Sequence, residues 1–214
     1  MTTLLIATRN AHKVVEIRAI LGDRFQFLTL DDFPAAPKVV EDADTFAGNA
    51  TKKALELAKW LSNLSHATRH SSLMVLADDS GLEVDALNGA PGVNSARFAA
   101  LDKTENSHDA DNNAKLLRLL KDVPLEKRNG RFRCVIALAE INPQSAIRNP
   151  QLFDGACEGR IQYTASGGGG FGYDPLFVPD GFTETFAELG EDVKNQLSHR
   201  AQALEKLKQF LTTR

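Results

Sequence analysis

Apolar residues recur along the chain with the spacing of helices in four places. Val14, Ile17 and Leu21 predict a helix over Ala11–Leu21, with Asn10 as its N-cap and Gly22 at its C-terminal end. Three more apolar faces predict further helices. One face consists of Ala50, Ala54, Leu57, Ala58 and Leu61, another lies within Thr104–Lys121, and the last consists of Ala201, Leu204, Leu207 and Leu211.

Short apolar runs between these segments predict strands. They are Leu4–Ala7, Phe25–Leu30, Leu73–Ala77, Phe132–Ile141 and Phe153–Tyr163. The run Phe132–Ile141 is typical of a central strand, and Phe153–Tyr163 suits an antiparallel neighbour. The chain has 214 residues, which fits one large α/β domain or two lobes.

The strand Leu73–Ala77 leads directly into two adjacent acids, Asp78 and Asp79. Ser80-Gly81 follows, and this pair predicts a turn. Carboxylates at the end of a buried strand suit a metal or catalytic site at the carboxyl edge of an open α/β sheet. If the strand continues through both acids, their side chains point to opposite faces, and the pattern leaves open which one faces the site.

Composition excludes several classes of protein. The net charge of −3 gives no overall basic field for nucleic acid, so an anionic ligand requires local Lys and Arg. No apolar stretch reaches the roughly 20 residues that span a bilayer, and the first residues lack the features of a signal peptide. Cys134 and Cys157 form no CxxC pair, so we expect two reduced thiols in an intracellular protein.

Charged residues gather at the start of the first two predicted helices. Lys13 lies in a first helical turn, where it is either a solvated lysine or part of a phosphate site. Glu41, Asp42 and Asp44 precede the second helix. The helix dipole alone explains acids there, and the alternative is a metal shared with Asp78-Asp79. Lys53, one turn inside that helix, would by itself be taken as solvated.

A glycine run extends from Ser166 to Pro175. It matches neither a P-loop nor a dinucleotide fingerprint, and a flexible surface loop is the simplest interpretation. The aromatic residues Phe171 and Tyr173 favour a second interpretation, because glycines let backbone approach a ligand and an aromatic ring offers a stacking plane for a base. Further along, Ser198-His199-Arg200 opens the last helix with groups that bind anions or carbonyls.

Four motifs together resemble the Ham1 / inosine triphosphatase family of house-cleaning nucleoside triphosphate pyrophosphatases, over nearly the whole chain. They occur in the family's order: Thr8–Lys13, Ala77–Phe98 with its Asp-Asp-Ser-Gly and Gly-Ala-Pro-Gly segments, Phe171–Asp174, and Ser198–Arg200. Each motif alone is a weak signal, and the four in order are specific.

The resemblance implies hydrolysis of ITP, dITP and XTP to the monophosphate and pyrophosphate with Mg²⁺. It implies an α/β fold with a long central mixed sheet, flanking helices and two lobes around a cleft, as one domain over residues 1–214. It also implies a homodimer. From composition and charge we expect a cytoplasmic protein that binds no nucleic acid and no membrane.

The same resemblance implies a role for each site residue. Asp79 would be the general base and a metal ligand, and Glu41 the second metal carboxylate. Ser80 would touch substrate. Phosphates would be held by Thr8, Asn10, Lys13, Lys53 and Arg97, the base or sugar would be surrounded by Phe171, Gly172, Tyr173 and Asp174, and the base would be recognised by Lys194, His199 and Arg200.

The chain departs from the family pattern at Gly48, where many relatives carry a glutamate; if that glutamate helps the metal or water, Glu41 and Asp79 do more here. We expect Asp79 to act as base without a large rise in its pKa, since an ordinary carboxylate accepts protons at neutral pH. Two rival functions remain open at this point. One is a pyrophosphatase for modified pyrimidine or methylated bases, and the other is a nucleotide-binding sensor without turnover.

Overall fold

The computed structural model describes residues 2–64, 73–100, 106–141 and 149–213. Six strands form one mixed sheet in the order β2-β1-β3-β4-β5-β6, in which β1 pairs in parallel with β2 and β3, and β6 pairs antiparallel with β5. The strands are β1 (Thr3–Ile6), β2 (Gln26–Thr29), β3 (Leu73–Val84), β4 (Asn129–Glu140), β5 (Gln151–Ile161) and β6 (Phe177–Pro179). The α/β fold class with a long mixed sheet is therefore confirmed.

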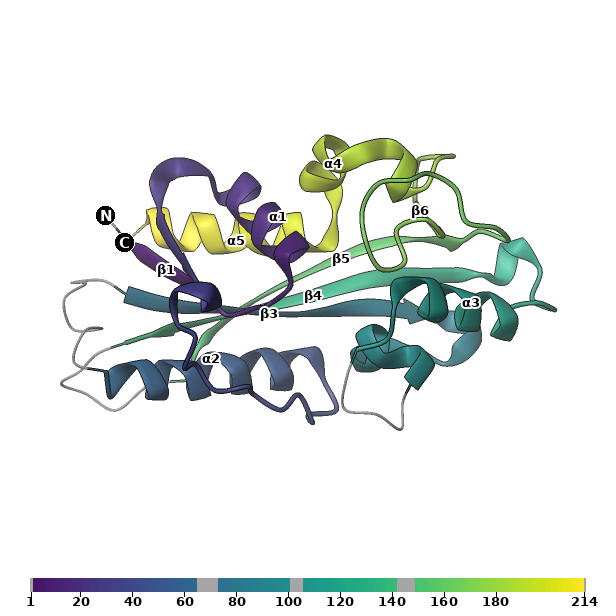
Figure 1. Ribbon diagram of the computed structural model, residues 1–214. Helices are drawn as coiled ribbons and strands as arrows, with labels where there is room; N and C mark the ends of the chain where they lie inside the picture. The colour runs from purple at the N-terminus through teal and green to yellow at the C-terminus, as the bar shows by residue number, and fades with distance from the viewer. Residues whose placement is uncertain (1, 65–72, 101–105, 142–148, 214) are drawn as a thin grey trace. The chain divides into compact units, whose positions relative to one another are not determined.

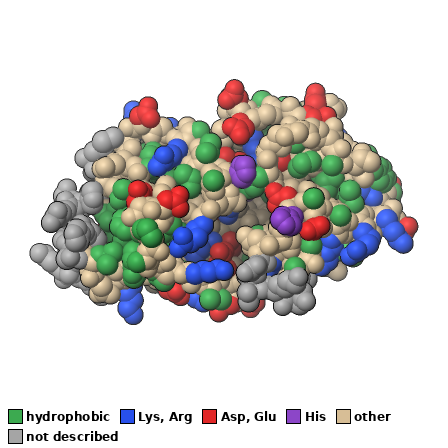
Figure 2. Space-filling view, viewed as in Figure 1, with side chains coloured by type: hydrophobic (Ala, Val, Ile, Leu, Met, Phe, Trp, Pro, Cys, Tyr) green, Lys and Arg blue, Asp and Glu red, His purple; other side chains and the backbone are tan. Residues whose placement is uncertain are grey.

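The helices among the described residues are α1 (Ala11–Leu21), α2 (Phe46–Ser62), α3 (Asp109–Leu119), α4 (Phe186–Leu197) and α5 (His199–Thr212) (Figure 1). None of them is both long and apolar enough to cross a membrane. Acidic and basic side chains are interspersed over the face of the molecule displayed in Figure 2.

The chain forms two compact units. The first comprises Met1–Asp79, Val135–Asp154 and Ala203–Arg214, and the second comprises Ser80–Cys134 and Gly155–Gln202. The chain passes from one unit to the other within β3, at the peptide bond between Asp79 and Ser80.

The first unit is built around β1, whose residues Thr3–Ile6 are all buried. A strand buried on both faces suits a parallel sheet with a helix on each side. Figure 1 shows α1 on one face of these strands and α2 on the other. The helix α1 has the predicted bounds, with Asn10 accepting hydrogen bonds from the amides of His12 and Lys13, and Gly22 ending it at a φ of 69°.

The second unit has its own apolar core. It is built from strands, helices and the glycine run, with Leu82, Val84, Phe98, Leu116, Phe132, Tyr173, Phe177 and Phe186 all buried. The rings of Phe132 and Phe177 meet edge to face, with centroids 4.7 Å apart. This core supplies the rigid support on which the candidate residues of the second unit are mounted.

Two sequence predictions are wrong. The pair Ser80-Gly81 forms no turn, because β3 runs without a break from Leu73 to Val84 and only then enters a 3₁₀ turn over Asp85–Leu87. Ladder pairing along the strand overrides the local preference of Ser-Gly. The helix expected over Thr104–Lys121 begins only at Asp109 and ends at Leu119. Residues 104 and 105 lie outside the described part of the chain.

Candidate active site

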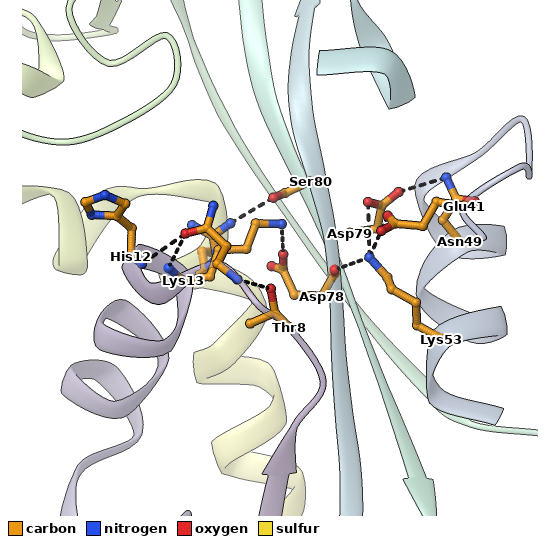
Figure 3. A network of polar contacts seen from close by, with 11 residues as sticks. Thr8, His12, Lys13, Glu41, Asn49, Lys53, Asp78, Asp79 and Ser80 are labelled. Carbon is orange, nitrogen blue, oxygen red and sulfur yellow. Dashed lines mark hydrogen bonds and ion pairs between the residues drawn. The ribbon is translucent and has the colours of Figure 1, made fainter. Parts of the chain in front are cut away.

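The two adjacent acids of β3 point to opposite faces of the strand, as the alternation of strand side chains requires (Figure 3). Asp78 faces α1, where its carboxylate accepts a hydrogen bond from Lys13 Nζ. Asp79 faces α2, where it meets Asn49 and Lys53. Both carboxylates are buried, so each requires a partner on its own face.

On the α2 face, one lysine serves two carboxylates. Lys53 Nζ lies 2.7 Å from Glu41 Oε2, 3.4 Å from Asp79 Oδ1 and 2.7 Å from the carbonyl oxygen of Asp78 (Figure 3). Asn49 Nδ2 donates a hydrogen bond of 3.1 Å to Asp79 Oδ2, and Asn49 Oδ1 accepts one of 2.9 Å from the amide of Ala43. We call Glu41, Asn49, Lys53 and Asp79 the acid–lysine group.

This arrangement changes the protonation of every charged member of the group. Burial raises the pKa of Asp79 to about 6; Lys53 and Lys13 oppose that rise and the neighbouring Glu41 adds to it. Burial also disfavours the charged form of Glu41, but its ion pair with Lys53 outweighs burial and holds the pKa of Glu41 below its ordinary value. Burial lowers the pKa of Lys53, and attraction by Asp79 and Glu41 outweighs this and raises it. Asp79 is therefore not the ordinary carboxylate expected from the sequence.

The acid–lysine group suits a hard divalent cation. Glu41 and Asp79 come from separate elements and both reach the same lysine Nζ, so two carboxylates with unlike pKa values lie within one small region. Mg²⁺ is commonly held by only one or two carboxylates together with substrate phosphates and water. Within the described residues no set of three or more His, Cys, Asp or Glu side chains is gathered in the manner of an all-protein metal centre.

On the α1 face, polar groups surround the start of the helix (Figure 3). Asn10 Oδ1 accepts hydrogen bonds from the amides of His12 and Lys13, at 2.9 and 3.3 Å. Thr8 Oγ1 accepts one of 3.2 Å from the amide of Asn10. The side chain of Asn10 thus already caps two amides of the first turn. The cation at this helix start is Lys13, which forms an ion pair with Asp78.

The second unit holds the remaining predicted residues around the glycine run. Asp174 Oδ2 accepts hydrogen bonds from Lys194 Nζ at 2.6 Å and from the amide of Phe171 at 2.8 Å. Lys194 Nζ lies 4.3 Å from the centroid of the Phe171 ring, and Arg200 Cζ lies 5.9 Å from it. Arg200 also donates a hydrogen bond of 2.8 Å to Ser80 Oγ.

Four other predicted residues of this unit make separate contacts. Tyr173 is buried in the apolar core and donates a hydrogen bond of 2.8 Å to the carbonyl of Ser95, so it supports the loop from within. His199 stacks on Phe132 with ring centroids 4.8 Å apart. Arg97 is partly buried, and its Nε donates a hydrogen bond of 3.1 Å to Asn94 Oδ1. Gly172 contacts α3 through its backbone, at a φ of 64°.

Sequence reasoning missed Asn49. It lies one turn before Lys53 on the buried side of α2, and a second polar residue among the apolar positions of that face was the available signal. Gly48, the departure noted above, is packed: a Cβ there would lie 2.7 Å from the Cβ of Ala43 and 3.1 Å from Thr45 Oγ1. The space beside Gly48 is thus filled by the loop that precedes α2.

Comparison with known proteins places this geometry in a family. The model of the Ham1 family matches residues 4–210. The chain belongs to the Ham1 family. The dITP/XTP pyrophosphatase of Desulforamulus reducens is 48% identical to this Ham1 chain over 209 residues, with 97% of the chain and 94% of the relative covered. The dITP/XTP pyrophosphatase of Shouchella clausii is 45% identical over 211 residues, with 99% and 97% covered.

Solved structures of Ham1 proteins share the fold. The HAM1 protein from Coxiella burnetii superposes with a TM-score of 0.80 at 36% identity, and each chain is covered completely. The Ham1 protein of Staphylococcus aureus superposes with a TM-score of 0.79 at 34% identity, with 99% of each chain covered. The resemblance inferred from the four motifs is thereby confirmed.

Proposed function

We propose that the protein hydrolyses ITP, dITP and XTP to the nucleoside monophosphate and pyrophosphate. The observation that carries this proposal is the acid–lysine group. A buried carboxylate, Asp79, has a pKa of about 6 and lies beside a second carboxylate and a lysine. Relatives that match nearly the whole chain are named dITP/XTP pyrophosphatases, which supports the choice of substrates.

Asp79 is the proposed general base. At neutral pH a carboxylate with a pKa near 6 is mostly ionised and accepts a proton more readily than an ordinary aspartate. It removes a proton from water as that water attacks the α-phosphorus. The bond from the α-phosphorus to the bridging oxygen breaks, and pyrophosphate leaves with the electron pair. Asn49 holds one oxygen of Asp79 and so directs the other toward Lys53 and the water.

Glu41 and Asp79 are the proposed ligands of Mg²⁺, which when bound neutralises charge on the phosphates. A nucleoside triphosphate carries about four negative charges, so local cations are also required. Lys13 and Lys53 are held in place by carboxylates in the first unit. Each close ion pair with a phosphate contributes roughly 4 kcal/mol at an effective dielectric constant of about 20, before desolvation. We assign phosphate binding to Thr8, Asn10, Lys13, Lys53 and Arg97.

Base selection is assigned to the second unit. The exposed edge of hypoxanthine or xanthine has a carbonyl at position 6, where adenine has an amine. Donors from Lys194, His199 or Arg200 would bind that carbonyl, whereas an amine would leave these buried donors unpaired. That penalty reaches a factor of about 10⁴ in a well-fitted site. The Phe171 ring is the proposed stacking plane for the base. The other residues assigned to substrate binding in this unit are Ser80, Gly172, Tyr173 and Asp174. Of these, Tyr173 supports the glycine run from within the apolar core.

The deciding experiment identifies the products made from ITP. Purified protein with Mg²⁺ is expected to release IMP and pyrophosphate in equal amounts, and chelation by EDTA is expected to stop release. IDP with phosphate would place the cleavage at another phosphorus, and binding of ITP without any product would indicate a sensor. A panel of ITP, XTP, GTP and ATP tests selection, since equal rates for ITP and ATP would contradict the donor assignment.

We also propose that the protein is a homodimer, as the family resemblance implies. Light scattering coupled to size-exclusion chromatography is expected to give twice the chain mass of 23.4 kDa. A monomeric mass at assay concentration would refute this.

A further inference from the structure

The glycine run is held from α3 by both backbone groups of one residue. The amide of Gly172 donates a hydrogen bond of 2.6 Å to Asp109 Oδ2, and the carbonyl of Gly172 accepts one of 2.9 Å from Asn113 Nδ2. Asp109 and Asn113 are four residues apart on α3, so they lie on the same side of the helix and grip the same peptide segment. We call this arrangement the Gly172 clamp.

Both clamp side chains make a contact beyond their own helix. Asp109 is exposed and lies in the first turn of α3, yet the helix has no side-chain N-cap and the Asp109 carboxylate bonds to Gly172. Asn113 Oδ1 is buried and has no hydrogen-bond partner among the described residues. If the side-chain amide of Asn113 were flipped, Oδ1 would face the carbonyl of Gly172, and two acceptors would be in contact. The contact of Nδ2 with Gly172 therefore fixes the orientation of Asn113, although a buried acceptor without a partner costs about 1–3 kcal/mol.

Gly172 lies between the two residues of the run that face other candidate groups. Phe171, on one side, packs against Lys194, and its amide bonds to Asp174. Tyr173, on the other side, is anchored in the core through the carbonyl of Ser95. Because Gly172 has a φ of 64°, a change in its peptide orientation would redirect Phe171 relative to Tyr173.

The far end of the run is fixed to α4. The amide of Gly169 donates a hydrogen bond of 3.3 Å to the carbonyl of Ala187, and Thr185 Oγ1 donates one of 2.9 Å to the carbonyl of Ser166. A Cβ on Gly167 would lie 2.5 Å from the carbonyl carbon of Ala187, so close packing against α4 requires glycine there. The run is therefore held at both ends, and the Gly172 clamp controls the end that carries Phe171.

We propose that Asp109 and Asn113 are positioning residues that fix the Phe171 ring for the base of the nucleotide. This inference rests on the proposed function for the identity of the ligand. Neither residue needs to touch the substrate, since both act through the backbone of Gly172. The run then behaves as a fixed wall, and loss of the clamp weakens binding of the base more than it slows the chemical step.

The test compares Asp109→Ala and Asn113→Ala with Asp111→Ala. Asp111 is an exposed acid in the same first turn of α3, so its removal reproduces the loss of charge without touching the run. Hydrogen exchange of a peptide that spans Gly170–Asp174 reports on the clamp directly, and steady-state kinetics with ITP reports on its consequence. We expect about tenfold faster exchange and an about tenfold higher KM in both clamp variants, with kcat within about twofold.

Asp109→Asn keeps an acceptor oxygen and is expected to recover part of the KM, which a general loss of stability would not produce. Exchange equal to that of Asp111→Ala would overturn the clamp, and faster exchange with unchanged KM would overturn its role in positioning Phe171. A fall in kcat at constant KM would assign the residues to the chemical step and overturn a positioning role. Absence of ITP turnover in the wild-type protein would refute the proposed function, while the exchange comparison would still decide whether the clamp exists.

Discussion

Two lysines, one in each unit, form ion pairs in different surroundings: Lys194 in the second unit and Lys53 in the first. Lys194 pairs with Asp174, and their side chains are 3% and 2% exposed. Lys53 is shared by Glu41 and Asp79, and the side chain of Glu41 remains 39% exposed. In the first arrangement both members of the ion pair are almost fully buried. In the second, two carboxylates contact one lysine Nζ, and one of them is partly hydrated.

The number of carboxylates that contact each lysine affects the chemistry of those carboxylates. In the acid–lysine group, Glu41 takes the shorter contact with Lys53, at 2.7 Å against 3.4 Å for Asp79. Asp79 is left incompletely compensated in a buried place, and its pKa rises to about 6. The buried pair Asp174–Lys194 holds its charged groups in fixed positions, whereas a carboxylate that shares its lysine with a second carboxylate can exchange a proton or bind a cation.

The largest expected effect comes from removing the base. Asp79→Asn keeps the shape of the side chain and is expected to lower ITP turnover at least about 10³-fold, because no carboxylate then accepts the proton of water. Binding of ITP, measured by calorimetry, is expected to remain. Full activity in this variant would refute the role of Asp79.

The buried pair Asp174–Lys194 is expected to contribute to stability. Lys194→Met removes the ammonium group that lies 2.6 Å from the buried Asp174 carboxylate, and breaking such a buried pair costs roughly 3–5 kcal/mol. Urea denaturation measures this loss. Lys53→Met should cost less, because Asp79 can take up a proton and Glu41 is partly hydrated. Lys52→Met, which breaks an exposed pair with Asp42, serves as the control and should change little. Equal losses for Lys194 and Lys53 would contradict the comparison.

The acid–lysine group is also expected to make the free energy of unfolding depend on pH in the absence of divalent metal. The pKa of Asp79 is raised from 3.8 to about 6 on folding, so its contribution is fully present below pH 3.8 and is lost as the pH rises through 6. Asp79→Asn removes this titration. Relative to wild type, the variant should therefore gain on the order of 1 kcal/mol between pH 5 and pH 7. Denaturation in EDTA at both pH values measures the difference, and a constant difference would show that Asp79 does not titrate there.

The smallest expected effect concerns the turn that leads into α2. Gly48→Ala gains helix propensity of up to about 1 kcal/mol, but its Cβ would lie 2.7 Å from that of Ala43, so we expect a net loss of about 1 kcal/mol. The double variant Ala43→Gly/Gly48→Ala removes the clash and should be at least as stable as Gly48→Ala alone. Urea denaturation of both variants measures this. A more stable Gly48→Ala would show that the loop before α2 yields easily.

The parts of the fold governed by local chemistry were predictable from the sequence. The helix α1 has its predicted bounds because a cap at Asn10, an apolar spacing and Gly22 all agree. Ser80-Gly81 was mistaken for a turn because the hydrogen bonds that keep β3 extended come from distant strands. No local pattern shows which strands will flank a Ser-Gly pair.

Within the candidate site, alternation along β3 predicted that Asp78 and Asp79 diverge, and the structure confirms it. The sequence did not reveal that Asp79 shares a lysine with Glu41, since that sharing depends on the path of the chain between residues 41 and 53. The contact of Asp109 and Asn113 with Gly172 was equally hidden, because it joins segments about 60 residues apart through backbone groups.

The unbroken course of β3 has a consequence for how the gene can change. Along an extended strand the side of each residue is set by whether its position is odd or even. Deleting or inserting one codon between Leu76 and Asp79 would turn Asp79 toward Lys13, so that Lys53 and Asn49 would meet the wrong residue. A substitution in this stretch changes one side chain, and its effect can be small or large. Insertion or deletion of one residue moves every following side chain of the strand to the opposite face, whereas insertion or deletion of two residues keeps each side chain on its original face.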